Sequence, residues 1–462
     1  MTSPSFSSLP LSSALLDNLE TLGYHGMTPI QAAALPPALA GRDLIAQAKT
    51  GSGKTAAFGL GIMQTLDPTD FRPQALVLCP TRELAEQVAN ELRRLARALD
   101  NVKVYTLCGG TPIRPQIESL KFGAHVLVGT PGRVMDHMDR GTVELGRVRT
   151  LVLDEADRML DMGFYDDVKK IAHACPPRRQ TLLFSATYEE DIRQASAGFL
   201  NRPEEIRVDT VHELGRIEQR FYEIDDERRV AVVAQLLEHY RPESTLAFCN
   251  TKAQCHALAS YLESRGISAL ALHGDLEQRE REDVMIQFAN RSCSVLVATD
   301  VAARGLDIDG LDAVINAEIT RDAEVHVHRI GRTGRGEATG MAFSLCAPHE
   351  LKWADQIEKY QGQPIVWANP KSLKRAPGGA LRAPMITLCI QGGKKDKLRP
   401  GDLLGALTKD AGIAADRIGK INILDFVSFV ALDRAIAQEA RSRLSERNIK
   451  GRRFRMRFMN ER

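Results

Sequence analysis

A stretch near the start of the chain, residues 46–55, constrains this protein more than any other feature. It reads Ala-Gln-Ala-Lys-Thr-Gly-Ser-Gly-Lys-Thr and begins in an apolar run that predicts a strand. Gly51 and Gly53 let the backbone turn its N–H groups onto phosphate oxygens, and the helix expected next adds partial positive charge at its start. The stretch therefore predicts a loop that binds the phosphates of a nucleoside triphosphate. One position departs from the usual pattern, since Ala48 stands where its first glycine would be.

The last two residues of this loop carry the charge and the metal ligand that a nucleotide needs. Lys54 can reach the β- and γ-phosphates, and the Thr55 hydroxyl can bind Mg²⁺. A glycine-rich loop beside a surface lysine is the alternative, and the strand–loop–helix context favours the nucleotide site. Besides Lys54 and Thr55, the nucleotide contacts expected from the loop are Ala48, Thr50, Gly51, Ser52 and Gly53.

An acidic cluster follows a second apolar run, at residues 151–153. Asp154 and Glu155 come directly after this run, and in open α/β sheets ligands lie beyond the carboxyl ends of the strands. These acids are therefore expected to face the same crevice as the phosphate-binding loop. We predict that Asp154 holds Mg²⁺ and that Glu155 positions or deprotonates the attacking water. A solvated helix start is the alternative for an acidic cluster taken alone.

Near-continuous apolar runs alternate with helical patterns, which predicts parallel sheets covered on both faces. A length of 462 residues allows about three domains. We predict the α/β fold class, with two tandem parallel-sheet domains at residues 1–205 and 216–362 joined by a linker at 206–215. The apolar runs that carry this prediction lie at residues 75–79, 125–129, 151–154, 181–185, 245–249, 268–272, 294–299 and 313–316.

The C-terminal part differs in composition from the rest of the chain. Prolines and glycines interrupt the pattern at residues 363–383, which predicts a linker. Residues 384–462 then follow the βαββαβ order of ferredoxin-like modules such as the RRM. From Lys371 onward there are 21 Lys and Arg against 9 Asp and Glu, although the net charge of the whole chain is only +2. We therefore expect a mildly acidic body joined to a basic nucleic-acid-binding module, with a solvated basic terminus as the alternative.

These motifs and their order resemble the DEAD-box ATP-dependent RNA helicases, which are named for the tetrapeptide at residues 154–157. The resemblance implies that both parallel-sheet domains are RecA-like. Residues 23–31 are similar to the Q motif of the family, in which Tyr24 would stack on adenine and Gln31 would bond to its edge. An amide both donates and accepts, which suits adenine and favours ATP over GTP. The other nucleotide contacts that the resemblance implies are Phe6 and Asp307.

The resemblance extends from residue 6 to about residue 345 and implies an RNA-binding surface in both domains. Threonines, arginines and glycines at strand ends suit contacts to phosphate and ribose, which position a strand without reading its sequence. Contacts to the 2′-hydroxyl would favour RNA over DNA. The residues implied in these contacts are Pro80, Thr81, Arg82, Gly110, Thr130, Gly132, Arg133, Thr251, Arg281, Thr299, Asp300 and Arg304.

Two further motifs would couple the nucleotide site to the RNA site. Ser185 and Thr187 resemble the coupling motif of the family, and His328 opens the second motif. In that second motif Arg332 and Arg335 look like arginine fingers, which are worth about 10³–10⁵ in rate, although a basic run alone could be a solvated face. ATP and RNA would each favour a closed form and raise affinity for the other. The implied activity is local separation of short RNA duplexes, with an ATP-gated RNA clamp and a DNA helicase as alternatives.

The C-terminal module narrows the resemblance to the bacterial DbpA subfamily, through the run at residues 392–402. In that subfamily the module is a divergent RRM that anchors the enzyme to a hairpin of large-subunit ribosomal RNA, which implies a role in ribosome assembly. The strand expected at 426–432 has only a partial aromatic set, so base stacking on the sheet is not expected to dominate. Arg455 and Arg457 alternate and would share one strand face. The RNA contacts expected here are Lys394, Lys395, Lys397, Arg399, Arg452, Arg453, Arg455 and Arg457.

Cysteine spacing and hydropathy indicate the cellular compartment in which the protein is expected. The eight cysteines include no C-x-x-C pair and lie mostly in apolar runs, so buried free thiols in a reducing compartment are expected. No apolar run reaches the ~18 residues that cross a membrane, and the first residues lack the basic and apolar regions of a secretory signal. We therefore expect a cytoplasmic protein with no membrane partner. The sequence leaves its oligomeric state open.

Overall fold

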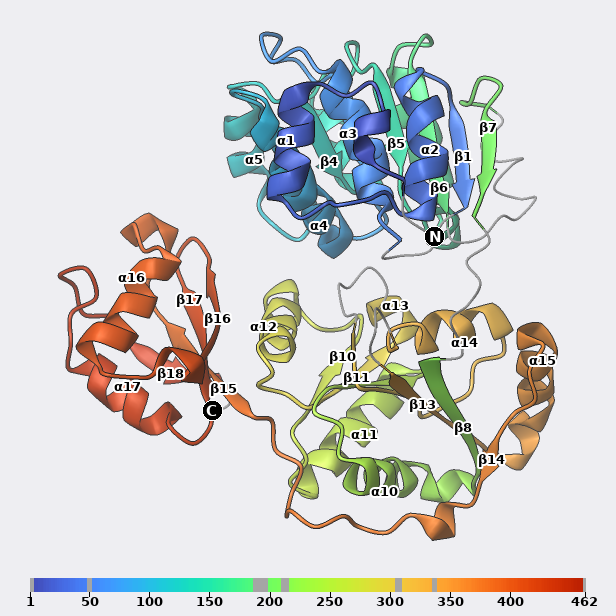
Figure 1. Cartoon of the computed structure of the whole chain (residues 1–462), viewed down its shortest axis with the longest axis vertical. Coiled ribbons are helices and arrows are strands. Elements are labelled where there is room, and N and C mark those ends of the chain that lie inside the picture. Colours follow the sequence, from blue (N-terminus) through green and yellow to red (C-terminus); the bar gives the residue numbers. More distant parts are fainter. Residues whose placement is uncertain are drawn as a thin grey trace. The chain divides into compact units, whose positions relative to one another are not determined.

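The protein, seen here as a computed structural model, consists of two compact units (Figure 1). The first unit contains the described residues up to 208, and the second contains those from 216 onward. Each unit is described by itself. Across the whole chain the described residues are 4–47, 52–185, 198–208, 216–303, 310–334 and 339–459.

The first unit is built on a parallel sheet whose strands lie in the order β3-β4-β2-β5-β6-β1-β7. The strands are β1 (Leu44–Gln47), β2 (Ala75–Leu78), β3 (Val104–Leu107), β4 (Val126–Gly129), β5 (Thr150–Leu153), β6 (Gln180–Ser185) and β7 (Glu204–Arg207). The helices are α1 (Ser13–Thr21), α2 (Pro29–Leu39), α3 (Lys54–Thr65), α4 (Arg82–Leu95), α5 (Ile113–Leu120), α6 (Pro131–Asp139), α7 (Ala156–Asp161) and α8 (Tyr165–Ala174).

Helices cover both faces of this sheet, so its central strands have no solvent-facing side. Val77 and Val128 point into the core that includes α1, α2, α3 and α4. Leu76 and Leu127, one residue earlier in each strand, point into the opposite core, with α6, α7 and α8. Successive side chains of a strand face opposite ways, so a strand covered on both faces is apolar at every position. The near-continuous apolar runs of the sequence are therefore explained, and the α/β prediction is confirmed.

The second unit contains a second parallel sheet, with the order β10-β11-β9-β12-β13-β8-β14. Its strands are β8 (Ile217–Glu223), β9 (Thr245–Cys249), β10 (Ala269–Leu272), β11 (Val295–Thr299), β12 (Ala313–Asn316), β13 (Gly340–Cys346) and β14 (Trp367–Ala368). The helices around it are α10 (Arg229–Tyr240), α11 (Lys252–Ser264), α12 (Gln278–Ala289), α13 (Asp300–Ala303), α14 (Ala323–Ile330) and α15 (Leu351–Gln361).

Two expected boundaries differ from the strands observed. The first parallel-sheet domain was expected to end at 205, but β7 continues to Arg207 at the edge of the first sheet. Residues 363–383 were expected to be a linker, yet β14 pairs with β8 inside this range. Later linker residues also bond to the second sheet domain, since the Ala376 N–H donates to the Glu238 carbonyl at 3.0 Å. Both strands lie at sheet edges, where half of the backbone groups need no partner and apolar patterning is weak.

The C-terminal module has the predicted βαββαβ order. Its elements are β15 (Met385–Ile390), α16 (Pro400–Gly405), β16 (Ile418–Ile423), β17 (Ser428–Asp433), α17 (Ala437–Ser445) and β18 (Met456–Phe458). The antiparallel sheet has the order β16-β17-β15-β18. Leu388, Val430 and Leu432 point from the sheet into a core shared with Leu403 of α16 and Leu444 of α17. The helices therefore occupy one face of this sheet.

The opposite face of the module's sheet contacts the second parallel-sheet domain. Thr387 of β15 accepts a hydrogen bond from Asn290 Nδ2 at 3.2 Å, and its hydroxyl lies 2.6 Å from that of Ser292. The Met385 N–H donates to the Arg291 carbonyl at 3.2 Å. These three partners form the turn between α12 and β11. The centre of the sheet is therefore closed on this side by protein.

Candidate functional site

Polar loops gather at the carboxyl edge of the first sheet, in two neighbouring groups. Strands β5, β6 and β1 are adjacent, and they lead into the acidic cluster, Ser185 and the glycine-rich loop. Strands β3, β4 and β2 are also adjacent, and they lead into the segments expected to bind RNA. All of these strands are parallel, so their carboxyl ends share one edge. The sheet order alone therefore places a phosphate site beside a second polar surface.

The glycine-rich loop ends in a left-handed residue that starts α3. Gly53 has φ 91°, and a Cβ there would lie 2.5 Å from Gln31 Nε2. Glycine is needed for both reasons, because a side chain would strain the backbone and collide with Gln31. The Gln31 amide donates to the Gly53 carbonyl at 3.0 Å and accepts from the Thr28 N–H at 2.9 Å. Gln31, which was predicted to bond to adenine, thus also holds the end of the phosphate-binding loop in place.

Lys54 and Asp154 form a buried ion pair at the centre of this edge. Lys54 Nζ lies 3.1 Å from Asp154 Oδ1, and the two side chains are 5% and 1% exposed. Burial opposes the charged ammonium, but Asp154, Glu155 and Asp157 outweigh it and raise the pKa of Lys54. The carboxylates therefore keep the Lys54 ammonium charged in a buried place, and a positive charge is what a phosphate ligand needs.

Glu155 occupies a backbone conformation that is unusual for its residue type. Its φ is 53°, in the left-handed region, and it caps the start of α7. Such a conformation costs roughly 1–3 kcal/mol and persists only where surrounding structure demands it. Its side chain is buried and bonds to Arg158 Nη1 at 3.0 Å. The strain turns the chain sharply after β5, so that consecutive acids can point in different directions.

Ser185 Oγ, at the end of β6, is buried and has no hydrogen-bond partner among the described residues, whereas Lys54 Nζ and Asp154 Oδ1 are paired with each other at 3.1 Å. Buried polar groups are normally satisfied, so an unsatisfied hydroxyl at the same edge as a buried ion pair suits a polar ligand. The Asp154 carboxylate and the half-buried Thr55 hydroxyl also form a donor set that suits Mg²⁺. The residues present therefore fit a nucleotide with its metal.

The predicted adenine contacts lie together on the same unit. Tyr24 packs edge-on against the buried Phe6, with ring centroids 6.1 Å apart. The Tyr24 hydroxyl donates to Glu91 Oε1 at 2.6 Å, and burial together with this carboxylate raises the pKa of Tyr24. The Tyr24 hydroxyl is thus fixed by the protein. Three other predicted nucleotide contacts lie outside the described residues, namely Ala48, Thr50 and Gly51.

The first-unit residues expected to bind RNA stand at the ends of β2, β3 and β4. Thr81 caps α4 by accepting from the Leu84 N–H at 3.3 Å. Arg133 donates to Gln116 Oε1 at 3.1 Å and to the Thr111 carbonyl at 3.0 Å, so its guanidinium holds the loop after β3. The others that follow these strands are Pro80, Arg82, Gly110, Thr130 and Gly132.

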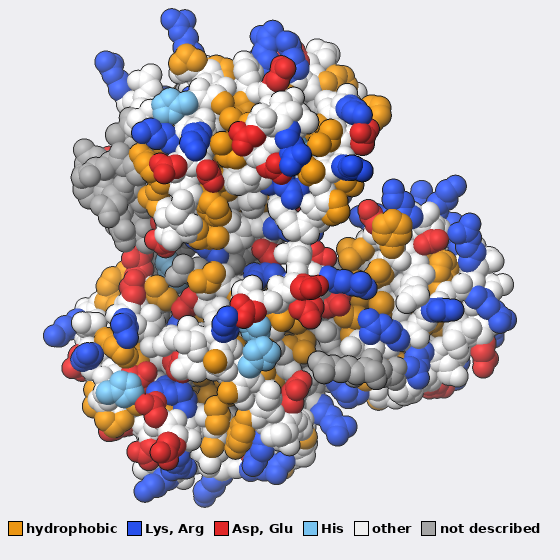
Figure 2. Space-filling view, turned by 180° about the vertical axis from the view of Figure 1, so that it is seen from behind, with side chains coloured by type: hydrophobic (Ala, Val, Ile, Leu, Met, Phe, Trp, Pro, Cys, Tyr) orange, Lys and Arg blue, Asp and Glu red, His pale blue; other side chains and the backbone are white. Residues whose placement is uncertain are grey.

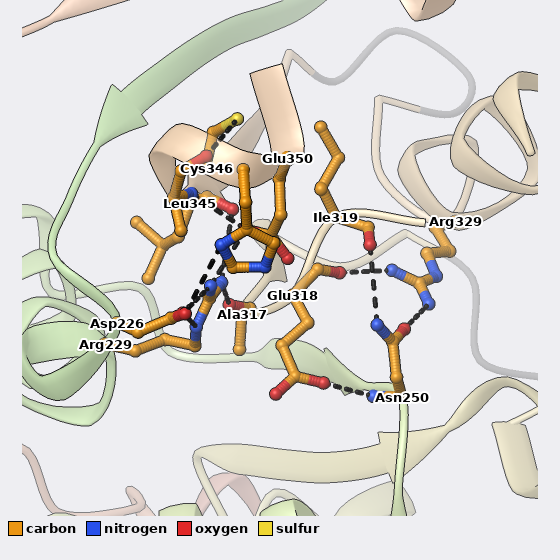
Figure 3. A network of polar contacts seen from close by, with 12 residues as sticks. Asp226, Arg229, Asn250, Ala317, Glu318, Ile319, Arg329, Leu345, Cys346 and Glu350 are labelled. Atoms are coloured by element: carbon orange, nitrogen blue, oxygen red, sulfur yellow. Dashed lines mark hydrogen bonds and ion pairs between the residues drawn. The ribbon is translucent and has the colours of Figure 1, made fainter. Parts of the chain in front are cut away.

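A buried arginine organises the corresponding edge of the second unit (Figure 3). Arg329 of α14 is 2% exposed and pairs with both oxygens of Asp300, at 2.7 and 2.6 Å. It also donates to the Glu318 carbonyl at 2.8 Å and to Asn250 Oδ1 at 3.1 Å. One side chain therefore connects the loops after β9, β11 and β12.

Asp300 was expected to contact RNA directly, and the structure assigns it a different partner. Both of its carboxylate oxygens are occupied by Arg329. A carboxylate beside a phosphate backbone would also be repelled. Asp300 is thus a support for neighbouring residues of the loop.

Other predicted residues of the second unit lie on the same edge. Thr251 caps α11 and Thr299 ends β11, where its hydroxyl accepts from the Ala302 N–H at 3.4 Å. Arg281 of α12 donates to the Ala302 carbonyl at 2.7 Å. His328 lies on α14, and Arg332 follows it in the turn after this helix. Besides Ala48, Thr50 and Gly51, four more predicted residues lie outside the described ranges, namely Thr187 of the first unit, and Arg304, Asp307 and Arg335.

The basic residues expected in the C-terminal module are exposed. Lys and Arg side chains spread over this module in Figure 2, where it is the lobe at the right. Those predicted to bind RNA are Lys394, Lys395, Lys397, Arg399, Arg452, Arg453, Arg455 and Arg457. Burial raises the pKa of Asp283 on α12, and Arg279 and Arg457 partly offset this. The Arg457 guanidinium therefore attracts the Asp283 carboxylate of the neighbouring parallel-sheet domain.

Sequence reasoning missed Arg329 and its partner Glu318. Arg329 lies in the basic run from His328 to Arg332, in which the arginine predicted to reach a nucleotide is Arg332. Its neighbours Val327 and Ile330 are both buried in α14, which is the one local signal that the side chain between them faces inward. Glu318 had no signal, since its role depends on the distant Asn250, whose N–H donates to Glu318 Oε2 at 2.7 Å.

Three family models match the chain in sequence order. They are "DEAD/DEAH box helicase" over residues 28–195, "Helicase conserved C-terminal domain" over residues 228–337, and "DbpA RNA binding domain" over residues 387–458. The first match spans β1 to β6, the second spans β9 to β12, and the third spans most of the antiparallel module.

Relatives match nearly the whole chain. The ATP-dependent RNA helicase DbpA of Escherichia coli (strain K12) is 52% identical, over 96% of this chain and 97% of its own length. The DEAD-box ATP-dependent RNA helicase CshA of Geobacillus kaustophilus (strain HTA426) is 43% identical over 82% of this chain and 81% of its own. Among solved structures, S. cerevisiae Dbp5 bound to RNA and ADP BeF3 has a TM-score of 0.73 and 30% identity, covering 80% of this chain and 96% of that one.

Proposed function

The chain belongs to the DEAD-box ATP-dependent RNA helicases, and from this premise we propose which residues bind ATP, drive its hydrolysis and engage RNA. Lys54 binds the phosphates and the Thr55 hydroxyl and Asp154 hold Mg²⁺ at the edge formed by β1, β5 and β6. When bound, Mg²⁺ neutralises phosphate charge. The observation that carries this assignment is the buried ion pair of Lys54 Nζ and Asp154 Oδ1 at 3.1 Å, together with the buried Ser185 Oγ that has no partner among the described residues.

Glu155 acts on the attacking water, as general base or as its orienting group. Its carboxylate is buried at the end of β5, one residue beyond Asp154. Arg158, bonded to Glu155 at 3.0 Å, fixes the direction of that carboxylate. Tyr24, Phe6 and Gln31 bound the place for adenine.

Turnover depends on the second unit, which provides Arg332 and Arg335 as charge-neutralising arginines. These arginines would place positive charge beside the negatively charged γ-phosphate oxygens, which stabilises the transition state of phosphoryl transfer. RNA is gripped by residues of both units, so RNA and ATP each favour the closed arrangement of the units and raise affinity for the other. A grip on one bent strand disrupts a short duplex locally, and hydrolysis releases it.

The C-terminal module directs this activity to large-subunit ribosomal RNA during ribosome assembly in the cytoplasm. Its match to a DbpA RNA binding domain supports RNA as the ligand, and its exposed lysines and arginines supply charge for it. None of the helices in the described part of the chain combines the length and the hydropathy that a membrane span requires.

ATP hydrolysis in the presence of fragmented large-subunit ribosomal RNA tests the targeting. The full chain should be stimulated by a small subset of fragments, and substituting Lys394, Lys395 and Lys397 together with alanine should remove that selectivity while stimulation by unstructured RNA remains. Equal stimulation by all fragments would refute the targeting, and equal stimulation by DNA would refute the preference for RNA.

A further inference from the structure

Phe426 is a large apolar side chain exposed on the rim of the C-terminal module. It lies in the turn between β16 and β17 and is 70% exposed. The turn is closed by the Leu424 N–H, which donates to the Val427 carbonyl at 2.8 Å. An aromatic ring held in water at the tip of a closed turn loses the hydrophobic free energy of burial. Single exposed apolar side chains are common on protein surfaces, so the surroundings of the ring decide whether it marks a binding site.

The turn is fastened to the basic loop between β15 and α16. The Lys394 N–H donates to the Leu424 carbonyl at 2.8 Å, and the Lys395 N–H donates to the Asp425 carbonyl at 2.9 Å. Gly393 lets the two loops approach, because a Cβ there would collide with the Leu424 and Asp425 backbone. The backbone that carries Phe426 is therefore held directly against the backbone that carries Lys394 and Lys395.

The face of the sheet that RRM-type modules use for stacking is not free in this protein. Thr387 at its centre bonds to Asn290 and Ser292 of the neighbouring domain, and Cys389 and Phe429 beside it are buried. The remaining aromatics of the module are also unavailable, because Phe458 is buried and Phe454 packs over Gly392. Among the four phenylalanines of residues 385–459, Phe426 is the exposed one.

Charge indicates which kind of partner this surface fits. Two exposed lysines stand in the loop bonded to this turn, and Asp396 of that loop is already engaged by the Gly393 N–H at 3.1 Å and by Arg452 at 3.5 Å. An aromatic ring beside ammonium groups matches a nucleotide, whose base stacks on the ring while its phosphates meet the amines. An unpaired base in a loop or bulge is the form of RNA that can offer its flat face.

We propose that Phe426 stacks on an unpaired nucleobase of the RNA that the module binds, with Lys394 and Lys395 on the flanking phosphates. This inference rests on the proposed anchoring of the module to structured RNA. Stacking of one base is sequence-tolerant, so Phe426 would add affinity and fix the orientation of the bound RNA loop.

The test compares full-chain variants for binding to hairpin-containing fragments of large-subunit ribosomal RNA at several salt concentrations. Phe426→Ala should weaken binding about tenfold without changing the salt dependence, since stacking releases no counterions. Lys394→Ala should weaken binding and lower the slope of log affinity against log salt by about one. Phe426→Tyr should restore affinity, and Phe122→Ala, at a 79% exposed phenylalanine of the first unit, should leave it unchanged.

A spectroscopic measurement separates stacking from general weakening. In Phe426→Trp, RNA should quench the added tryptophan fluorescence beyond the change seen with the unsubstituted chain, which contains Trp353 and Trp367. Unchanged RNA affinity in Phe426→Ala, with Lys394→Ala still weakened, would overturn the role of Phe426 and leave the anchoring intact. If Phe426→Ala kept its RNA affinity but lost a protein that binds the unsubstituted chain, the ring would serve a protein partner, and the proposed base stacking would also be overturned. If neither lysine nor phenylalanine variants change RNA binding, the anchoring itself fails.

Discussion

Lys54 Nζ lies 3.1 Å from Asp154 Oδ1 in a site where both side chains are buried. The ammonium proposed for phosphate and the carboxylate proposed for the metal therefore neutralise each other. Breaking a buried pair without replacing its partners is costly. A nucleotide that arrives with its metal supplies both replacements at once, so we infer that ATP without a divalent cation binds far more weakly than the metal complex.

Removing Lys54 tests this pairing. Lys54→Ala should abolish ATP hydrolysis and lower the free energy of unfolding of the first unit by about 3–5 kcal/mol, because Asp154 is left buried and unpaired. Urea denaturation measures the stability. The matched control is Lys121→Ala, which removes an exposed ion pair with Glu118 of 2.7 Å and should cost at most about 1 kcal/mol. Equal losses in the two variants would contradict the inference.

Glu155→Gln should separate binding from chemistry. The amide keeps the size of the side chain and its contact with Arg158, so ATP should bind with near-normal affinity, whereas hydrolysis should fall at least about 10²-fold without the base. Nucleotide titration and single-turnover hydrolysis measure the two steps. Hydrolysis at the unsubstituted rate would remove Glu155 from the reaction.

Two neighbouring arginines are expected to fail in different ways. Arg329→Ala removes the side chain that joins Asp300, Asn250 and Glu318, so the second unit should lose about 3–5 kcal/mol of stability. Arg332→Ala should lower RNA-stimulated hydrolysis by about 10³-fold or more, with a smaller change in stability. Thermal unfolding and ATPase rates distinguish them. The reverse pattern would exchange their assigned roles.

Acid should destabilise the second unit through His326. This imidazole is buried against Phe221, its nitrogens bond to no described residue, and burial together with Arg329 lowers its pKa to about 3. The unfolded chain binds the proton near pH 6.5, so stability is full above that pH and falls below it by up to about 1.4 kcal/mol per unit. This loss of stability with falling pH continues down to the pKa of His326 in the folded state.

The variant His326→Phe isolates this effect. Urea denaturation between pH 7 and pH 5 should show a pH slope about one proton smaller than that of the unsubstituted chain. His349→Gln, at an exposed histidine, should keep the original slope. An unchanged slope in His326→Phe would mean that other groups, such as the buried His137 that bonds to Gln116, carry the acid sensitivity.

The sequence predicts most of the strands whose two faces are both covered, because burial on both sides forces continuous apolar runs. The predicted runs do not include β13, although this strand is almost entirely buried. They also do not include β8, which reads Ile-Glu-Gln-Arg-Phe-Tyr-Glu near the sheet edge, or the two-residue β14 beside it. The nucleotide residues follow from local motifs. The buried position of Arg329 depends on loops that are far apart in the chain. The contacts of Thr387 with Asn290 and Ser292 are likewise distant in sequence. No local sequence pattern predicts such contacts.

The most direct test of the account is displacement of a short RNA strand from a duplex that adjoins a large-subunit ribosomal RNA hairpin, followed with ATP and with a non-hydrolysable analogue. The full chain should release the strand only with ATP, and faster than from the same duplex beside an unrelated hairpin. ATP-dependent retention of the RNA without displacement would instead identify a clamp. Equal release beside either hairpin would contradict the targeting by the C-terminal module.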